Sequence, residues 1–298
     1  MSHAASLPHP QSARALVRDY LELSKARIVM MVLLTTAAGF AIASAGAIDW
    51  TLLVNLMIGT GLIAGGTNAL NQFAERDLDA RMKRTMHRPL PAGRITPRAA
   101  LLFSVTVSVS GAAYLIAFVN PLTSLLGVLT LGSYLFIYTP LKQKTSLSTI
   151  VGAVPGAIPP MMGWAAATNT IEFGAWVLFS ILFMWQLPHF LAIGWLYRED
   201  YARAGFSILS VSDPAGRISG RQSLVWSLAL VPVSLLPVIG ETPGPVYLAL
   251  AVLTGALLVV TSFGFARVPS MRSARHLFLA SIVYLPVIMT LLVVTARA

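Results

Sequence analysis

The chain has 298 residues, of which 56% are hydrophobic and only 11% are charged, and it contains no cysteine. A soluble domain carries about 25% charged residues, so this composition excludes a surface covered by water and requires apolar side chains that face lipid. Without cysteine, disulfides and thiolate metal sites are excluded, and the net charge of +10, which would indicate nucleic acid in a soluble protein, first needs a topological explanation.

Residues 1–20 are polar, and no apolar segment of the kind found in a cleaved signal peptide follows them. We expect a flexible cytoplasmic tail here. Beyond it, apolar stretches long enough to cross a hydrocarbon core of about 30 Å recur along the chain. Nine crossings are predicted, at residues 28–48, 52–72, 99–119, 121–139, 148–167, 173–196, 222–240, 245–265 and 277–295.

The basic residues support this count independently of hydropathy. With nine crossings, every lysine and arginine except Arg297 lies on one side of the membrane. The positive-inside rule places that side, and with it the amino terminus, in the cytoplasm. The sequence therefore predicts an all-α membrane protein with a single domain over residues 1–298, and it explains the charge without a nucleic-acid partner.

An acidic segment follows the second predicted crossing. Asn71, Glu75 and Asp79 are spaced four residues apart, which places three oxygen-bearing side chains on one face of a helix. Oxygen ligands suit a hard cation such as Mg²⁺, which commonly bridges one or two carboxylates to substrate phosphates. Alternatively, these are solvated charges at a helix exit. Arg84 and Arg88 follow and could neutralise a polyanion, although the positive-inside rule alone would place basic residues here.

The Asn71-x-x-x-Glu75-x-x-x-Asp79 pattern resembles the first motif of the intramembrane aromatic prenyltransferases, the superfamily of 4-hydroxybenzoate polyprenyltransferase. Further segments narrow the resemblance to the protohaem IX farnesyltransferase (haem O synthase) family. They are residues 82–93 (MKRTMHRPLPAG), 138–142 (YTPLK) with 156–166 (GAIPPMMGWAA), and 185–190 (WQLPHF) followed by 199–205 (EDYARAG).

The resemblance implies nine transmembrane helices around a central cavity that opens to the cytoplasmic side, in the cell inner membrane. It implies transfer of a farnesyl group from farnesyl diphosphate to a vinyl group of haem B, with water adding a hydroxyl, to give haem O and diphosphate. Mg²⁺ would be the cofactor, and a haem A synthase could use the product downstream.

The resemblance also assigns roles to individual residues. Metal ligands would be Asn71, Glu75, Asp79 and Asp200; the catalytic residues would be Asp79, Asp200 and Lys142; substrate contacts would come from Arg84, Arg88, Tyr138, Lys142, Tyr201 and His189. His189 could contact the haem, or it could form a hydrogen bond to a neighbouring helix. Two positions depart from the superfamily pattern: Glu75 replaces an aspartate, and Ala204 stands where the second motif has its other aspartate.

Two other functions remain open. A secondary transporter could build an ion site from the same acidic residues, but transporters usually place their charges near the membrane midplane. Here the acidic residues lie at the inner rim beside lysine and arginine, which favours an enzyme acting on a polyanionic lipid. The closer alternative is a prenyltransferase with another acceptor, such as a quinone precursor or chlorophyllide.

Overall fold

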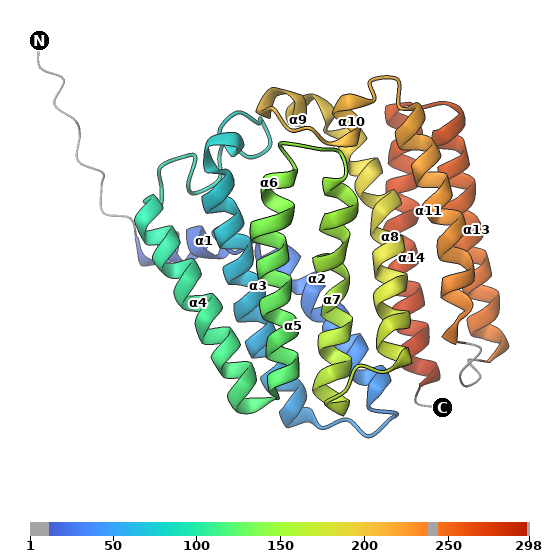
Figure 1. Cartoon of the computed structure of the whole chain (residues 1–298), viewed down its shortest axis with the longest axis horizontal. Coiled ribbons are helices and arrows are strands. Elements are labelled where there is room, and N and C mark those ends of the chain that lie inside the picture. The colour runs from blue at the N-terminus through green and yellow to red at the C-terminus, as the bar shows by residue number, and fades with distance from the viewer. Residues whose placement is uncertain (1–11, 238–243, 297–298) are drawn as a thin grey trace, which may run out of the picture.

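The computed structural model describes residues 12–237 and 244–296, and within them every regular element is helical. Figure 1 shows the long helices running side by side in one bundle. The elements are α1 (Ala13–Leu23), α2 (Ala26–Ala43), α3 (Trp50–Asp79), α4 (Pro97–Phe118), α5 (Pro121–Gly132), the π-helix η1 (Ser133–Tyr138), α6 (Thr139–Leu141), α7 (Ser148–Thr168), α8 (Phe173–Leu196), α9 (Arg198–Ala204), α10 (Leu209–Ser212), α11 (Arg217–Leu235), α13 (Pro245–Arg267) and α14 (Met271–Thr295).

Eight helical segments of the described chain are long and apolar enough to cross a membrane. They are α2, α3, α4, the continuous run from α5 to α6, α7, α8, α13 and α14. The expected all-helical, multi-pass membrane protein is therefore confirmed. The remaining predicted crossing, at 222–240, falls on α11, which is too polar to be counted by the same measure, and residues 238–240 lie outside the described part.

The polar residues of α11 explain this difference from the predicted nine, because the exposed Arg221 and Gln222 lower its mean hydropathy most and four serines lower it further. Ser219, Ser223, Ser227 and Ser234 are all buried against the rest of the bundle. The Ser227 hydroxyl lies 2.7 Å from that of Ser262 on α13. Small polar residues let membrane helices approach closely and bond to each other. The mean hydropathy of a helix does not distinguish polar residues that face neighbouring helices, as these serines do, from polar residues that face water.

One end of the bundle gathers the segments that follow α3, α6 and α8. Figure 1 shows the loop after α3, the connection between α6 and α7, and the short helices α9 and α10 together at its upper end. Met82, just after α3, packs with Ala204 and Phe206, which belong to the α9–α10 region. The Ser207 backbone N–H donates to the Lys142 carbonyl at 2.8 Å. Residues far apart in the sequence therefore meet at this end, which we call the upper end.

The expectation of a flexible tail over residues 1–20 is wrong for its second half. Residues 13–23 form helix α1, whose first turn is capped by the Ser12 hydroxyl accepting from the Ala15 backbone N–H at 3.3 Å. Arg94 holds this helix from the loop after α3, with ion pairs of 3.0 Å to Asp19 and 2.6 Å to Glu22. Residues 1–11 of the expected tail lie outside the described residues.

Candidate functional site

Helix α3 carries three polar side chains into the upper end of the bundle. Asn71, Glu75 and Asp79 lie in its last turns and are 1%, 5% and 1% exposed, whereas the Asp77 side chain on the other face is 79% exposed. The four-residue spacing therefore places them on one buried face, as predicted. Their burial also rules out the alternative that they are solvated charges at a helix exit.

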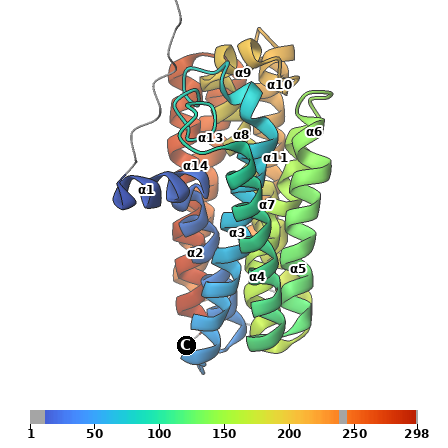
Figure 2. The same cartoon turned by 90° about the vertical axis from the view of Figure 1, so that its left-hand side faces the viewer.

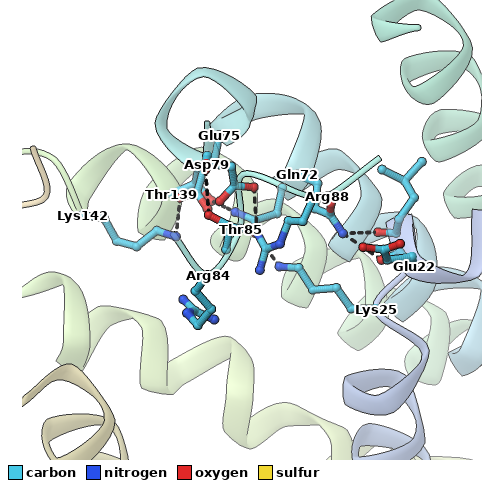
Figure 3. Close-up of polar contacts among 12 residues, drawn as sticks. Glu22, Lys25, Gln72, Glu75, Asp79, Arg84, Thr85, Arg88, Thr139 and Lys142 are labelled. Carbon is cyan, nitrogen blue, oxygen red and sulfur yellow. Dashed lines mark hydrogen bonds and ion pairs between the residues drawn. The ribbon is translucent and has the colours of Figure 1, made fainter. Parts of the chain in front are cut away.

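Each of these side chains has a basic partner from a different part of the chain. Figure 3 shows Lys142 and Arg88 beside Glu75 and Asp79. Lys142, directly after α6, forms an ion pair with Glu75. Arg88 in the loop after α3 donates from Nη1 to Asp79 Oδ2 at 2.7 Å. Lys25, between α1 and α2, donates from Nζ to Asn71 Oδ1 at 2.9 Å. Three cations therefore converge on one polar face inside a membrane-embedded fold.

Sequence reasoning missed Lys25, because a lysine just before a membrane-spanning segment is already explained by the positive-inside rule. Its backbone is in the left-handed region, with φ of 52°, where α1 turns into α2. Burial, together with the nearby charge of Arg88, lowers the pKa of Lys25 from 10.5 to about 7. A bound anion would oppose both effects, so Lys25 suits a site that receives additional negative charge.

Lys142 and Tyr138 lie together, as the family resemblance implies. Lys142 Nζ is 4.8 Å from the centre of the Tyr138 ring and 5.4 Å from that of Phe206. Burial alone would lower the pKa of Lys142, but the Glu75 carboxylate outweighs it and raises that pKa above its ordinary value. Tyr138 ends the π-helix η1, a rare geometry that is frequent at functional sites. Thr139 follows and accepts from Asn71 Nδ2 at 3.2 Å.

The second predicted motif lies on α9, but its carboxylate is engaged locally. Asp200 forms an ion pair with Arg203 one turn later, and among the described residues it makes no ion pair or hydrogen bond with the α3 cluster. The Tyr201 hydroxyl instead accepts from Arg84 Nη2 at 3.5 Å, and the Arg84 guanidinium lies 5.9 Å from the Tyr201 ring centre. Arg84 and Tyr201 therefore join α9 to the loop after α3.

His189 lies inside α8, seven residues before its end, and its contacts are with α14. Its Nδ1 is 2.8 Å from the Ser281 hydroxyl, and its ring stacks between Trp185 and Phe278 with centroid distances of 4.9 and 5.2 Å. The alternative of a hydrogen bond to a neighbouring helix is thus present in the structure. A contact to haem stays a prediction.

The donor set fits a magnesium ion that is shared with a ligand. No three histidine, cysteine, aspartate or glutamate side chains cluster in the described chain, so the four predicted ligands do not form a ready-made cage. However, Asp79 Oδ1 is buried without a hydrogen-bond partner, beside the carboxylate of Glu75. Mg²⁺ is usually bound by one or two carboxylates together with substrate phosphates. This pair of acidic side chains meets that requirement.

Comparison with known proteins agrees with this geometry. Residues 32–285 match the UbiA prenyltransferase family. The chain belongs to this family. It is 45% identical to a protein named protoheme IX farnesyltransferase from Solibacter usitatus over 91% of this chain and 96% of that protein.

Two solved structures show the same fold. A digeranylgeranylglyceryl phosphate synthase superimposes with a TM-score of 0.80 at 18% identity, covering 94% of this chain and 98% of that one. A UbiA homologue from Archaeoglobus fulgidus, solved with DMAPP and Mg²⁺, gives a TM-score of 0.67 at 15% identity, covering 93% and 97%.

Proposed function

We propose that this chain transfers a farnesyl group from farnesyl diphosphate to a vinyl group of haem B, with water supplying the hydroxyl, to give haem O and diphosphate. The observation that carries the proposal is the convergence of Lys25, Arg88 and Lys142 on the buried face of Glu75 and Asp79. Its substrate assignment is supported by the relative named protoheme IX farnesyltransferase, which matches 91% of this chain.

The placement of the helices supports nine crossings with the site near the cytoplasmic side. In Figure 1, α2 runs from the level of α1 down to the lower end of the bundle, α14 finishes at that same lower end, and α11 runs along the bundle. An odd number of crossings follows if α11 also spans the membrane. The positive-inside rule then places the upper end, with a cavity opening there, on the cytoplasmic side of the inner membrane.

The diphosphate is the group that these charges would hold. Glu75 and Asp79, with Asn71, would hold Mg²⁺, which when bound neutralises charge building on the leaving diphosphate. The ammonium of Lys142 and the guanidinium of Arg88 then exchange their carboxylate partners for diphosphate oxygens. Preorganised cations in a site that excludes water stabilise a leaving group without reorganisation.

Residues of α9 and of the loop after α3 would complete the substrate contacts. Arg84 is exposed and lies against Tyr201, so both can reach a diphosphate that enters from the upper end. Asp200 would serve a second metal only if its pair with Arg203 opens. The Tyr138 ring beneath Lys142 would contact the first isoprene unit, because an allylic cation is stabilised by an aromatic face.

The acceptor would lie against α8 and α14. Ser281 occupies Nδ1 of His189 and leaves Nε2 for the haem iron or a propionate. Trp185 and Phe278 provide flat apolar surfaces on either side of this ring. Farnesyl transfer requires only that a vinyl carbon reach the diphosphate end of the donor, so iron ligation holds the acceptor and takes no part in bond formation.

The test is to produce the chain in membranes of a bacterium that makes no haem O and to extract the haems. A farnesylated haem is expected with the wild type, and Asp79→Asn is expected to lower its yield at least about 100-fold. Asp77→Asn is the matched control, because Asp77 is exposed on the opposite face of the same helix turn. Unchanged haem B together with a prenylated quinone precursor would favour the other acceptor class, and full activity of Asp79→Asn would refute the site.

A further inference from the structure

Helix α1 has an exposed apolar face that the bundle leaves uncovered in the part of the chain the structure describes. Leu16, Val17 and Leu21 are 43%, 59% and 55% exposed. They lie on one side of an amphipathic helix, and Figure 2 shows α1 lying across the direction of the long helices, beside the start of α2. We propose that this face binds the lipid bilayer, so that α1 lies in the membrane surface at the level where α2 and α4 begin.

The opposite face of α1 is held by the protein. At about 100° per residue, Asp19 lies about 200° around the helix from Val17. Asp19 is buried and, with Glu22, is bound by Arg94 from the loop after α3. The acidic face therefore points to the polar loops of the upper end, and the apolar face points away from them.

An aromatic contact shows which way the apolar face points. Tyr20, which lies between Leu16 and Val17 on the helix circumference, packs against Phe103 with ring centroids 4.6 Å apart. Phe103 lies in the second turn of α4, inside a segment that can cross the membrane. The apolar face of α1 is therefore directed along the bundle toward the hydrocarbon region, and not toward water.

The charges beside this face suit lipid headgroups. Arg14 and Arg18 are exposed and lie next to the apolar face, and this is the composition of helices that bind in the plane of the interface. Each basic residue near an anionic membrane surface adds to the attraction. The partner is therefore a bilayer that contains anionic lipid. This inference rests on the multi-pass arrangement and is independent of the reaction proposed above.

The surface-bound helix is also linked to the site. Gln72 on α3 donates to the carbonyls of Glu22 and Leu23 at 2.9 and 2.8 Å. The chain then turns directly into Lys25. An anchored α1 thus holds the first of the three site cations in place.

The experiment uses the full chain with one added cysteine, because the protein has none of its own. Val17→Cys and the matched Ala15→Cys, about 200° around the helix, are spin-labelled and reconstituted into vesicles of three parts phosphatidylcholine to one part phosphatidylglycerol. Collision rates with oxygen and with a water-soluble nickel chelate are measured. Position 17 is expected to favour oxygen, at a depth of about 5–10 Å, and position 15 to favour nickel.

Two results would overturn the assignment. Equal nickel access at positions 17 and 15 would show that the apolar face is in water. Low access of both reagents at position 17 would show that a protein, such as a second copy, covers it. For the anionic preference, position 17 is expected to become shallower in pure phosphatidylcholine, and Arg14→Gln/Arg18→Gln should abolish this difference. If the depth of position 17 does not depend on the lipid while both arginines are present, the role of the two arginines is refuted.

Discussion

Removing only one partner of the ion pair between Glu75 and Lys142 should lower the free energy of unfolding. The two side chains are 6% and 11% exposed, so water cannot solvate the charge that remains when its partner is removed. Removing one member of a buried pair costs about 3–5 kcal/mol, compared with about 0–1 kcal/mol for an exposed pair. We expect Glu75→Gln and Lys142→Met each to lower the free energy of unfolding by about 3–5 kcal/mol.

Removing both charges should restore most of that loss. The double variant buries no unpaired charge, and replacing a buried pair by uncharged groups is often neutral or stabilising. The assay is reversible unfolding by sodium dodecyl sulfate in mixed micelles, followed by circular dichroism, for the wild type, both single variants and the double variant.

The exposed Arg76–Asp77 pair is an internal reference, with side chains 37% and 79% exposed. Asp77→Asn should change stability by less than about 0.5 kcal/mol. If the losses of the two single variants simply add in the double variant, the buried pair is not coupled and the reasoning is wrong. The double variant should nevertheless be inactive, because Lys142 is proposed to hold the diphosphate.

Two further predictions concern the surroundings of the site. A Cβ at Gly152 would lie 2.5 Å from the Tyr138 ring, so Gly152→Ala should displace that ring from beneath Lys142 and raise the KM for farnesyl diphosphate several-fold. A Cβ at Gly132 meets nothing within 4 Å, so the control Gly132→Ala should leave the KM unchanged. Equal KM values for the two variants would contradict this prediction. Because the pKa of Lys25 is lowered to about 7 and a bound diphosphate would raise it, binding at pH 8 should take up a proton and affinity should fall as pH rises above 7. Calorimetry in buffers of different ionisation enthalpy should detect that uptake in the wild type and not in Lys25→Met, and the same uptake in both proteins would assign it to another group.

The α3 part of the site was predictable because it depends on local geometry. A helix repeats every 3.6 residues, so a spacing of four places Asn71, Glu75 and Asp79 on one face wherever the helix lies. Their partners were not predictable in the same way. Lys25 is 46 residues from Asn71 in the sequence, and only the packing of α2 and α6 against α3 brings the cations to the carboxylates. The ion pair between Asp200 and Arg203 was not predictable either, because the sequence does not show which basic side chain the Asp200 carboxylate pairs with.

The sequence by itself determined that this is a helical membrane protein, because its apolar stretches of about 20 residues have the length of a helix that crosses a bilayer. A helix satisfies its backbone hydrogen bonds within itself. Only the tertiary structure decided how the borderline segments are used. Residues 222–240 are predicted as a crossing from their apolar content, and only the structure shows that the serines of α11 are the side chains that face neighbouring helices. Residues 13–20 are predicted as part of a tail, and only the structure shows them in α1, whose acidic face is held by Arg94. Average composition reports how much of a segment is apolar, but which side of it meets lipid depends on neighbours that are distant in sequence.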